Sequence, residues 1–319
     1  MRLRDIDAIA VTVKPGIPTS LLIGLNFGKY LSEVGCKPLI PIHHMEAHAL
    51  TARIVEKIEF PYLTLLISGG HCLLAIVENV DKFYLLGTTM DIAPGDILDK
   101  AGRRMKLNNI PDFQNMCGGA AIELAANQAT DMEQFQFPLT LMHQKDCNFS
   151  YTGLLNTIYL YINEQEKEHN IQGDMIIPDV YNLCAGIQFT IARHLCHRTQ
   201  RAMEFFNSSH MVPEGNRTLV VSGGVASNNF FAKSLSFLCS EMGYKFFRPP
   251  HKLCTDNGIM VAWNGMERWK INSGVLTTPD EIDKLKVEHK SPLGTDWREY
   301  VIDKNIKCTW VKVKRAHAN

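Results

Sequence analysis

The chain has 319 residues, which corresponds to one large domain or to about two domains of ordinary size. Apolar residues make up 45% and charged residues 21% of the sequence, as in ordinary globular proteins. The 33 basic and 33 acidic residues give a net charge of zero. This excludes a histone-like polybasic protein, so any nucleic-acid contact must come from local patches. No apolar run approaches the roughly 20 residues that cross a bilayer, and we expect no membrane partner.

Strand-like and helix-like segments alternate along the chain, which indicates an α/β fold with a mixed sheet. Strands are indicated by short β-branched or apolar runs, and helices by apolar positions three and four residues apart. In chain order we expect strand 6–13, helix 20–34, strand 39–42, helix 44–54, strands 62–67, 72–77 and 83–88, helices 97–105, 122–127 and 180–206, strand 219–221, helix 229–242, strand 244–247 and helix 256–269. Residues 108–119 are expected to form a loop, and residues 272–319 a polar, turn-rich segment that ends in a basic stretch.

Nine cysteines are present, an odd number without a Cys-x-x-Cys pair. Several lie in apolar helix-like or strand-like segments, where a free thiol behaves as a small apolar side chain. This pattern favours a reducing compartment over a disulfide framework. No signal or transit peptide is visible before the first strand-like segment.

His44 and His48 lie four residues apart in an expected helix. Four residues correspond to about 400° of rotation, so both imidazoles lie on one face and can reach a single ion. Neutral imidazole is a common ligand of divalent metals, but two histidines need a third ligand to form a site. Two histidines on a partly wet helix face are the simpler interpretation of this pair alone.

The pair differs from the His-Glu-x-x-His motif of zinc peptidases, in which the glutamate follows the first histidine and acts as general base. Here the acid is Glu46, two positions after His44 and roughly 200° around the helix. We therefore expect Glu46 to point away from a metal. A metallopeptidase is the least favoured of the possible functions.

The sequence Ser-Gly-Gly occurs twice, each time directly after an apolar strand, at residues 68–70 and 222–224. Glycine allows the backbone to approach a ligand closely, so that its N–H groups can bind phosphate. The second copy precedes a helix, whose N-terminus also favours anions. One such bend is most often a tight turn, whereas two make a two-sided nucleotide cleft plausible.

Two aspartates are candidates for the same site. Asp256 lies in Cys-Thr-Asp-Asn-Gly (254–258), where Asp or Thr suits the N-cap of the following helix. Its carboxylate could also supply the third ligand beside His44 and His48. Asp99 could accept hydrogen bonds from a ribose or a substrate amine, although a solvated helix face explains it equally.

Seven motifs in this order resemble one known family. They are His44-x-x-x-His48, Leu-Ile-Ser-Gly-Gly-His (66–71), Ile-Leu-Asp-Lys (97–100), Cys-Gly-Gly-Ala-Ala-Ile-Glu (117–123), Phe-Ser-Tyr-Thr-Gly-Leu (149–154), Ser-Gly-Gly-Val-Ala-Ser-Asn (222–228) and Cys-Thr-Asp-Asn-Gly (254–258). Over roughly residues 5–270 the chain resembles the tRNA N6-adenosine threonylcarbamoyltransferases, formerly described as O-sialoglycoprotein endopeptidases. Seven motifs in register are far more specific than any one of them.

The resemblance implies the actin-like ATPase fold, with two ribonuclease-H-like lobes and a cleft between them. We expect a partial N-terminal lobe over residues 1–58, a second lobe with both Ser-Gly-Gly bends over 59–262, and a C-terminal helix with a basic tail over 263–319. The family's first strand and first phosphate loop have no counterpart here, so we expect an incomplete first lobe and a chain of low stability or weak activity.

The resemblance also implies an acyl transfer. Family members move the threonylcarbamoyl group of threonylcarbamoyl-AMP, which a separate synthase supplies, to the exocyclic amine of the adenosine 3′ of the anticodon. Their tRNAs read codons that begin with A. The implied cofactor is one divalent metal ion per subunit, iron or zinc, and a homodimer is a further expectation.

Carried over position by position, the resemblance assigns the metal ligands to His44, His48 and Asp256. No general base is assigned. The implied substrate-binding residues are Leu66, Ile67, Ser68, Gly69, Gly70, Asp99, Gly119, Glu123, Ser227, Asn228 and Thr255.

Two departures from the family favour its mitochondrial branch. Leu155 stands where the family has a lysine, and the segment 108–117 is longer and less regular than in the bacterial members. Candidate phosphate contacts to tRNA are found in three basic clusters: Arg103, Arg104 and Lys106; Arg193, His194, His197, Arg198 and Arg201; and Lys307, Lys312, Lys314 and Arg315. A solvated charged face is the simpler explanation for each cluster alone.

Two alternatives stay open. A kinase that binds ATP or a sugar phosphate on the same scaffold would use the two bends but would not need His44 or His48. A non-catalytic, shortened isoform would retain only a dimer or tRNA surface.

Overall fold

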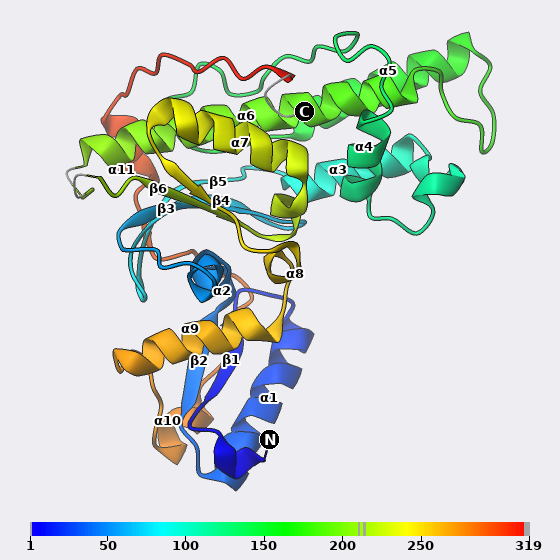
Figure 1. Ribbon diagram of the computed structural model, residues 1–319. Coiled ribbons are helices and arrows are strands. Elements are labelled where there is room, and N and C mark those ends of the chain that lie inside the picture. The colour runs from blue at the N-terminus through cyan, green and yellow to red at the C-terminus, as the bar shows by residue number, and fades with distance from the viewer. Residues whose placement is uncertain (1, 210, 213–214, 316–319) are drawn as a thin grey trace.

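A computed structural model describes residues 2–209, 211–212 and 215–315. In that part of the chain the longer strands form two separate sheets, which Figure 1 shows one below the other. The small sheet pairs β1 (Ile9–Lys14) with β2 (Leu39–His43) in parallel. The large sheet has six strands in the order β7-β6-β3-β4-β5-β8 and contains both parallel and antiparallel pairs. The expected α/β class with a mixed sheet is confirmed.

The small sheet is covered by one helix on each face. Neighbouring residues of a strand point to opposite faces. Val11 packs against Gly28 of α1 (Pro18–Gly35), and Ala10 packs against Gly265 of α9 (Gly258–Lys270). Helix α10 (Pro279–Lys284) lies beside α1.

The large sheet is built around a hairpin. Strand β3 (Tyr62–Ile67) pairs antiparallel with β4 (Cys72–Asn79), which pairs antiparallel with β5 (Lys82–Thr88). On the other side of β3, β6 (Thr218–Ser222) and then β7 (Lys245–Phe247) run parallel to it. The short β8 (Thr295–Asp296) pairs with β5.

Helices cover both faces of the large sheet, so every residue of β3 is buried. The face toward the small sheet is covered by α2 (His44–Leu50), which also contacts α9. The opposite face carries a thick helical layer, which packs on Leu63, Leu65 and Ile67. The helices packed into that core are α3 (Pro94–Arg104), α4 (Gly118–Ala126), α5 (Thr152–Glu168), α6 (Val180–Ser208) and α7 (Asn229–Met242).

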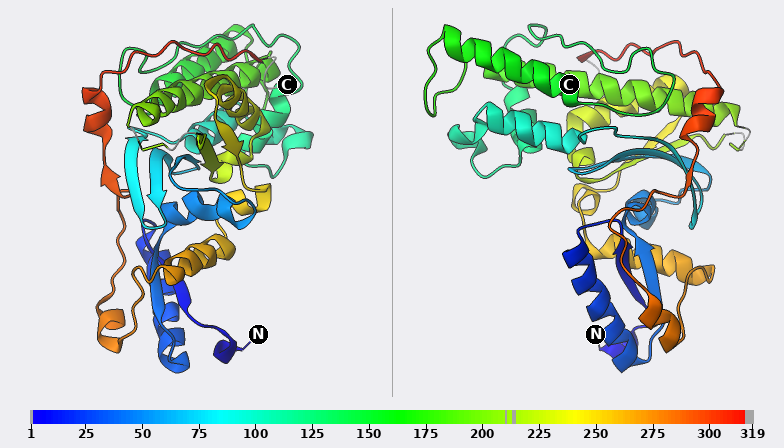
Figure 2. Two further views of the ribbon diagram at one scale, coloured as in Figure 1. Left: turned by 60° about the vertical axis from the view of Figure 1, so that its left-hand side comes forward. Right: turned by 180° about the vertical axis from the view of Figure 1, so that it is seen from behind.

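The C-terminal segment contains α11 (Arg298–Asp303) and then crosses the helical layer, as the red trace in Figure 2 shows. Within the described residues, no helix is both long and apolar enough to span a bilayer.

The expected strands and helices are confirmed, with bounds shifted by a few residues. The last expected helix begins at Gly258 instead of residue 256, and the expected helix 44–54 continues past Leu50 as the 3-10 helix Thr51–Ile54. Helices α5 and α8 (His251–Cys254) lie in segments for which no element was expected, and α10, β8 and α11 lie within the expected turn-rich segment. The expected loop 108–119 contains short 3-10 helices, and α4 already begins at Gly118. The division into residues 1–58, 59–262 and 263–319 stays a prediction; α9, which spans residue 262, packs on the small sheet.

The contact between α9 and the small sheet leads to a prediction about stability. A Cβ at position 265 would lie 2.5 Å from the Cβ of Ala10, so Gly265→Val should lower the free energy of unfolding by about 1–3 kcal/mol through overpacking. Gly258→Ala is the control in the same helix, because nothing lies within 4 Å of its Cβ position. Urea denaturation measures both, and an unchanged stability of Gly265→Val would contradict the packing.

Candidate functional site

The two Ser-Gly-Gly bends come together because β3 and β6 are parallel neighbours. Leu66 of β3 is paired with Ser222 of β6, so both strands end at the same edge of the sheet and both bends leave from that edge. Segments separated by about 150 residues in the sequence thereby form one wall of a site.

Gly223 shows how closely the two bends approach each other. Its φ angle is +100°, in the region that L side chains rarely adopt. A Cβ at this position would also lie 2.3 Å from the carbonyl oxygen of Ile67. Both the conformation and the contact therefore require glycine here.

Two cavities adjoin the bends. The larger one, which we call the main cleft, has a volume of about 810 Å³ and lies between the small and large sheets. Its lining residues are Thr12, Pro15, Gly16, Ile17, Ser20, Leu21, His44, Ser68, Gly69, Gly70, His71, Gly224, Thr255 and Asp256.

The second cavity, which we call the side cavity, has a volume of about 400 Å³. It shares Gly69, Gly224 and Thr255 with the main cleft, so the two cavities meet at the bends. Its remaining lining residues are Gly95, Leu98, Asp99, Cys117, Gly119, Ala120, Glu123, Val225, Ser227, Asn228, Asn229 and His251.

The start of α2 fixes the two histidines of the expected metal site. Nδ1 of His43 accepts a hydrogen bond from the backbone N–H of Met45 at 3.2 Å and so caps the helix. Burial lowers the pKa of His43 to about 4, which keeps the ring neutral and Nδ1 able to accept at pH 7. His44 and His48 then follow on one face, with ring centroids 4.7 Å apart.

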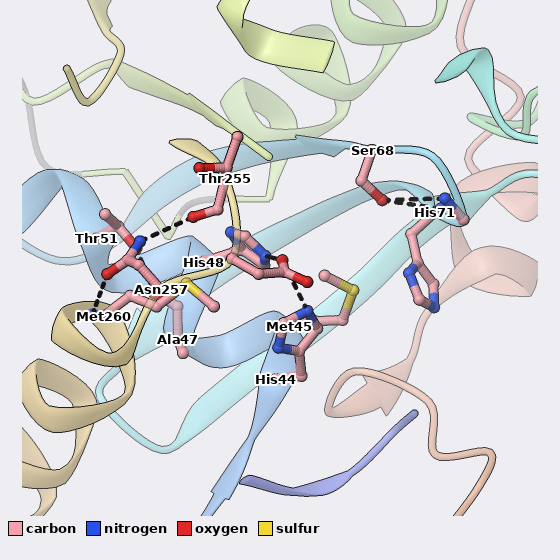
Figure 3. Close-up of polar contacts among 12 residues, drawn as sticks. His44, Met45, Ala47, His48, Thr51, Ser68, His71, Thr255, Asn257 and Met260 are labelled. Carbon is pink, nitrogen blue, oxygen red and sulfur yellow. Dashed lines mark hydrogen bonds and ion pairs between the residues drawn. The ribbon is translucent and has the colours of Figure 1, made fainter. Parts of the chain in front are cut away.

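Asp256 reaches both imidazoles from the loop between α8 (His251–Cys254) and α9. Its Oδ1 lies 3.3 Å from Nε2 of His44 and 3.0 Å from Nε2 of His48. In Figure 3 the two histidines face the loop that carries Thr255 and Asn257. Hydrogen bonds from His44 and His48 hold the pKa of the Asp256 carboxyl far below its usual range, so the carboxylate is charged.

The three side chains form a donor set that could hold one cation. Their ligand atoms all lie within 4.8 Å of one another. A tetrahedral ion with bonds of about 2.0–2.1 Å separates neighbouring ligands by about 3.4 Å, close to the distances of 3.3 and 3.0 Å from Oδ1 of Asp256 to the two imidazole nitrogens. Nδ1 of His48 is buried and has no hydrogen-bond partner among the described residues, which leaves Nε2 as its ligating nitrogen.

Asp256 is available for this role because another residue caps α9. Oδ1 of Asn257 accepts a hydrogen bond from the N–H of Met260 at 2.9 Å. The alternative that Asp256 or Thr255 is the N-cap is therefore wrong. The helix begins two residues later than expected, and the Asp256 side chain lies on the cleft.

Glu46 points away from the histidine pair, as expected. Its Oε2 accepts a hydrogen bond from Arg268 of α9 at 2.6 Å, and both side chains are largely buried. The carboxylate thus joins α2 to α9 and is not available as the general base of a peptidase.

Other expected substrate-binding residues line the side cavity and are held by hydrogen bonds. Oδ1 of Asp99 accepts from the N–H of Gly118 at 2.7 Å, at the start of α4. Oε1 of Glu123 accepts from the N–H of Asn229 at 2.8 Å. The other oxygen of each carboxylate takes no part in these bonds. Gly119 and Ser227 line the same cavity.

Leu66 and Ile67 require a correction. Their side chains are 1% and 0% exposed and lie in the two cores on opposite faces of β3, because successive residues of a strand alternate. Neither lines a cavity, so only their backbone could approach a ligand. Leu155, the departure from the family's lysine, is also buried in the core.

Three residues with reactive or ionisable side chains were not expected at the site. His71 lines the main cleft, and Cys117 and His251 line the side cavity. His71 directly follows the first Ser-Gly-Gly, and Figure 3 shows it on the same turn as Ser68. Membership of two of the seven motifs was the available signal for His71 and Cys117. His251 lies three residues before the motif 254–258, and only the fold places it at the side cavity.

The sequence matches the family model for tRNA N6-adenosine threonylcarbamoyltransferase over residues 1–263. The chain belongs to this family. A mitochondrial tRNA N6-adenosine threonylcarbamoyltransferase of Homo sapiens is 46% identical over 310 residues, which cover 97% of this chain and 74% of the human protein. A probable mitochondrial enzyme of the same name from Drosophila melanogaster is 40% identical over 312 residues, which cover 97% of this chain and 76% of the fly protein. The tRNA N6-adenosine threonylcarbamoyltransferase of Rhizobium meliloti (strain 1021) is 40% identical over 299 residues, which cover 93% of this chain and 79% of the bacterial protein.

Among solved structures, HypF of T. kodakarensis is similar in fold. The TM-score is 0.53, with 13% sequence identity, over 85% of this chain and 42% of HypF. This likeness concerns the fold alone.

The geometry of the histidine pair and Asp256 leads to a prediction about metal binding. His48→Ala should weaken the affinity for Zn²⁺ by at least about 100-fold, because loss of a direct ligand exceeds the loss seen for outer-shell partners. His169→Ala, which removes an exposed histidine at the end of α5, is the control and should retain the affinity. Titration calorimetry on metal-free protein measures both, and equal affinities of wild type and His48→Ala would contradict the site.

Proposed function

We propose that this chain transfers the threonylcarbamoyl group of threonylcarbamoyl-AMP to the exocyclic amine of the adenosine 3′ of the anticodon, in tRNAs that read codons beginning with A. The observation that carries the proposal is that two cavities meet at the paired Ser-Gly-Gly bends beside His44, His48 and Asp256. A donor that joins a nucleotide to an acyl group needs two such compartments. Membership of the family supports the same reaction.

The donor would span both cavities. Its adenosine would lie in the side cavity, where Asp99 and Glu123 each offer a carboxylate oxygen to ribose hydroxyls. Its phosphate would lie at Gly69 and Gly224, which line both cavities, since backbone N–H groups at such bends bind anions. The threonylcarbamoyl group would extend into the main cleft, which the acceptor adenosine enters.

The transfer forms a bond between the adenosine amine and the carbamoyl carbon and breaks the bond from that carbon to the phosphate oxygen of AMP. The proton lost by the amine passes to the departing phosphate or to water. A divalent ion held by His44, His48 and Asp256 would supply Lewis acidity that polarises the mixed anhydride. The glycine N–H groups stabilise negative charge on the departing phosphate. The cleft positions the weakly nucleophilic amine, and no side chain is assigned as a base.

We propose zinc or iron as the metal, one ion per subunit, because two imidazoles and one carboxylate suit these ions. The two sheets are proposed to be the cores of two ribonuclease-H-like lobes of an actin-like fold. The names of the animal relatives support a mitochondrial location, and a separate synthase would supply the donor.

We further propose that the chain forms a homodimer through α1. Four apolar side chains on this helix are 57–73% exposed, and they recur at intervals of four, three and four residues, so they form one stripe. These are Ile23, Phe27, Tyr30 and Val34. An exposed apolar stripe of this length is typical of a helix that packs against a partner.

The transfer is tested by incubating the chain with tRNA, threonylcarbamoyl-AMP and Zn²⁺ or Fe²⁺, followed by mass spectrometry of the nucleosides. We expect threonylcarbamoyladenosine, and His48→Ala should reduce its initial rate at least about 100-fold because a metal ligand is lost. His169→Ala, which removes an exposed histidine of the helical layer, is the control. Undiminished product with His48→Ala would refute the metal role. In a parallel incubation with ATP and a sugar, formation of ADP and a sugar phosphate would favour the kinase alternative.

The homodimer is tested by light scattering after size-exclusion chromatography. Wild type should elute with twice the 36.0 kDa mass of one chain, and Phe27→Asp should elute as a monomer because it places a charge in the apolar stripe. Leu160→Asp is the control, since Leu160 is an equally exposed leucine on α5. A monomeric wild type would rule out this interface.

A further inference from the structure

Two of the three basic clusters expected from the sequence meet on the helical layer, whereas the third does not form an open surface. Arg104 binds Glu166 of α5 through both of its terminal nitrogens, and Lys106 donates to the carbonyl of Gly173. Residues 193–201 belong to α6, and the C-terminal segment that carries residues 307–315 lies across that helix.

Hydrogen bonds from α6 hold the C-terminal segment in place. The side chain of Gln200 donates to the carbonyl of Thr309 at 2.8 Å and accepts from the N–H of Val311 at 3.0 Å. Arg201 donates to the carbonyl of Ile306 at 2.6 Å. The position of Trp310, between the two backbone groups bound by Gln200, is therefore fixed relative to the helix.

A groove of about 410 Å³, which we call the α6 groove, lies between the helix and this segment. Its polar and aromatic lining residues are Phe189, Arg193 and His197 from α6, and Trp310 and Lys312 from the segment. Phe189, Arg193 and His197 are spaced four residues apart, so they lie along one face of the helix.

The groove carries an excess of positive charge. Among the described residues, no carboxylate lies within ion-pair distance of Arg193, Arg201 or Lys312. Burial, followed by the charges of Arg193, Arg198 and Arg201, lowers the pKa of His197 to about 4. The ring itself is therefore neutral at pH 7, and three arginine side chains add positive charge near it.

Not every expected phosphate contact reaches this surface. His194, Arg198 and Arg201 are only 2–4% exposed, so the expectation that they bind phosphate directly is wrong. Arg198 is instead used inside the fold, where it donates to the carbonyl of Asp146 and lies 3.6 Å from its carboxylate. Arg193 and Lys312 are the cations that line the groove.

Aromatic rings lie next to these cations. The ring of Trp310 stacks on His197 with centroids 4.3 Å apart and an interplanar angle of 4°. The guanidinium of Arg193 lies 5.7 Å from the centroid of Phe189. Cations combined with aromatic faces in one groove are typical of surfaces that bind nucleic-acid strands, where phosphates meet the cations and bases meet the rings.

The groove is joined to the catalytic region through the start of α7. Asn228, which lines the side cavity, donates to Gln188 of α6 at 3.0 Å. Phe230 contacts Phe189 of the groove edge to face, with centroids 6.4 Å apart and an interplanar angle of 85°. The groove and the side cavity therefore meet at the contact between α6 and the start of α7. One tRNA molecule is large enough to reach both.

We propose that the α6 groove is a second tRNA-binding site, in which Arg193 and Lys312 bind backbone phosphates and Trp310 and Phe189 pack against a ribose or an unstacked base. The identity of this RNA as the acceptor tRNA rests on the proposed function. An acidic protein segment could form ion pairs with Arg193 and Lys312 but would leave the rings of Trp310 and Phe189 without a stacking partner.

The test is the binding of a fluorescent tRNA transcript, with an anticodon for codons that begin with A, measured by anisotropy at a series of KCl concentrations. Arg193→Ala combined with Lys312→Ala should lower the affinity about 100-fold, about tenfold for each lost charged contact. The slope of log affinity against log salt should fall by about 1–2. Trp310→Leu should lower the affinity about tenfold and leave the slope unchanged.

Two controls make the result specific to the groove. Lys245→Ala removes an exposed lysine at the start of β7 and should leave affinity and slope unchanged, and Arg193→Lys should retain most of the slope. Thermal melting of each variant shows whether it is folded. In the transfer assay the double variant should raise the KM for tRNA without changing kcat or the KM for threonylcarbamoyl-AMP.

The outcomes separate this proposal from the proposed function. If wild type makes no threonylcarbamoyladenosine and yet binds tRNA with the predicted dependence on Arg193 and Lys312, the groove is supported and the transfer reaction fails. If the folded double variant binds tRNA with wild-type affinity and slope, the groove proposal is overturned. Unchanged tRNA binding together with lost binding of polyglutamate would assign the groove to an acidic protein and also overturn it.

Discussion

The site depends on the parallel pairing of β3 with β6. This pairing ends two apolar strands at one edge of the large sheet and brings the two Ser-Gly-Gly bends into contact, so closely that only glycine fits at position 223. The two cavities share these bends. With a different register the two cavities would not share a wall. A ligand that joins a nucleotide to a second group would then have no continuous site.

The helices position the charged groups relative to that wall. Helix α2 lies between the sheets and presents His44 and His48, while the loop before α9 presents Asp256. The ion pair between Glu46 and Arg268 ties α2 to α9 from the other side. The Glu46 carboxylate, which lies between the two histidines in the sequence, therefore has a structural role and does not face the site.

Much of the fold was predictable because it is encoded locally. Apolar runs located the strands, and the seven motifs located most of the side-cavity residues. Helix α5 was missed although Leu154, Ile158 and Ile162 recur at four-residue spacing, so its signal was present. The cap of α9 was misassigned because Asp256 and Asn257 suit an N-cap equally well in sequence. The pairing of β3 with β6 and the meeting of two basic clusters at α6 depend on contacts between distant segments, which no local pattern encodes.

The placement of the three candidate ligands has a consequence for motion. His44 and His48 belong to a helix that contacts the large sheet, whereas Asp256 precedes a helix that packs on the small sheet. Helix α2 also contacts the small sheet and α9, so the distance from the carboxylate to both imidazoles depends on how α2 is seated against α9. An ion held by these three groups would favour the observed seating, and a change that shifts α2 along α9 would weaken the binding of the ion by the same free energy.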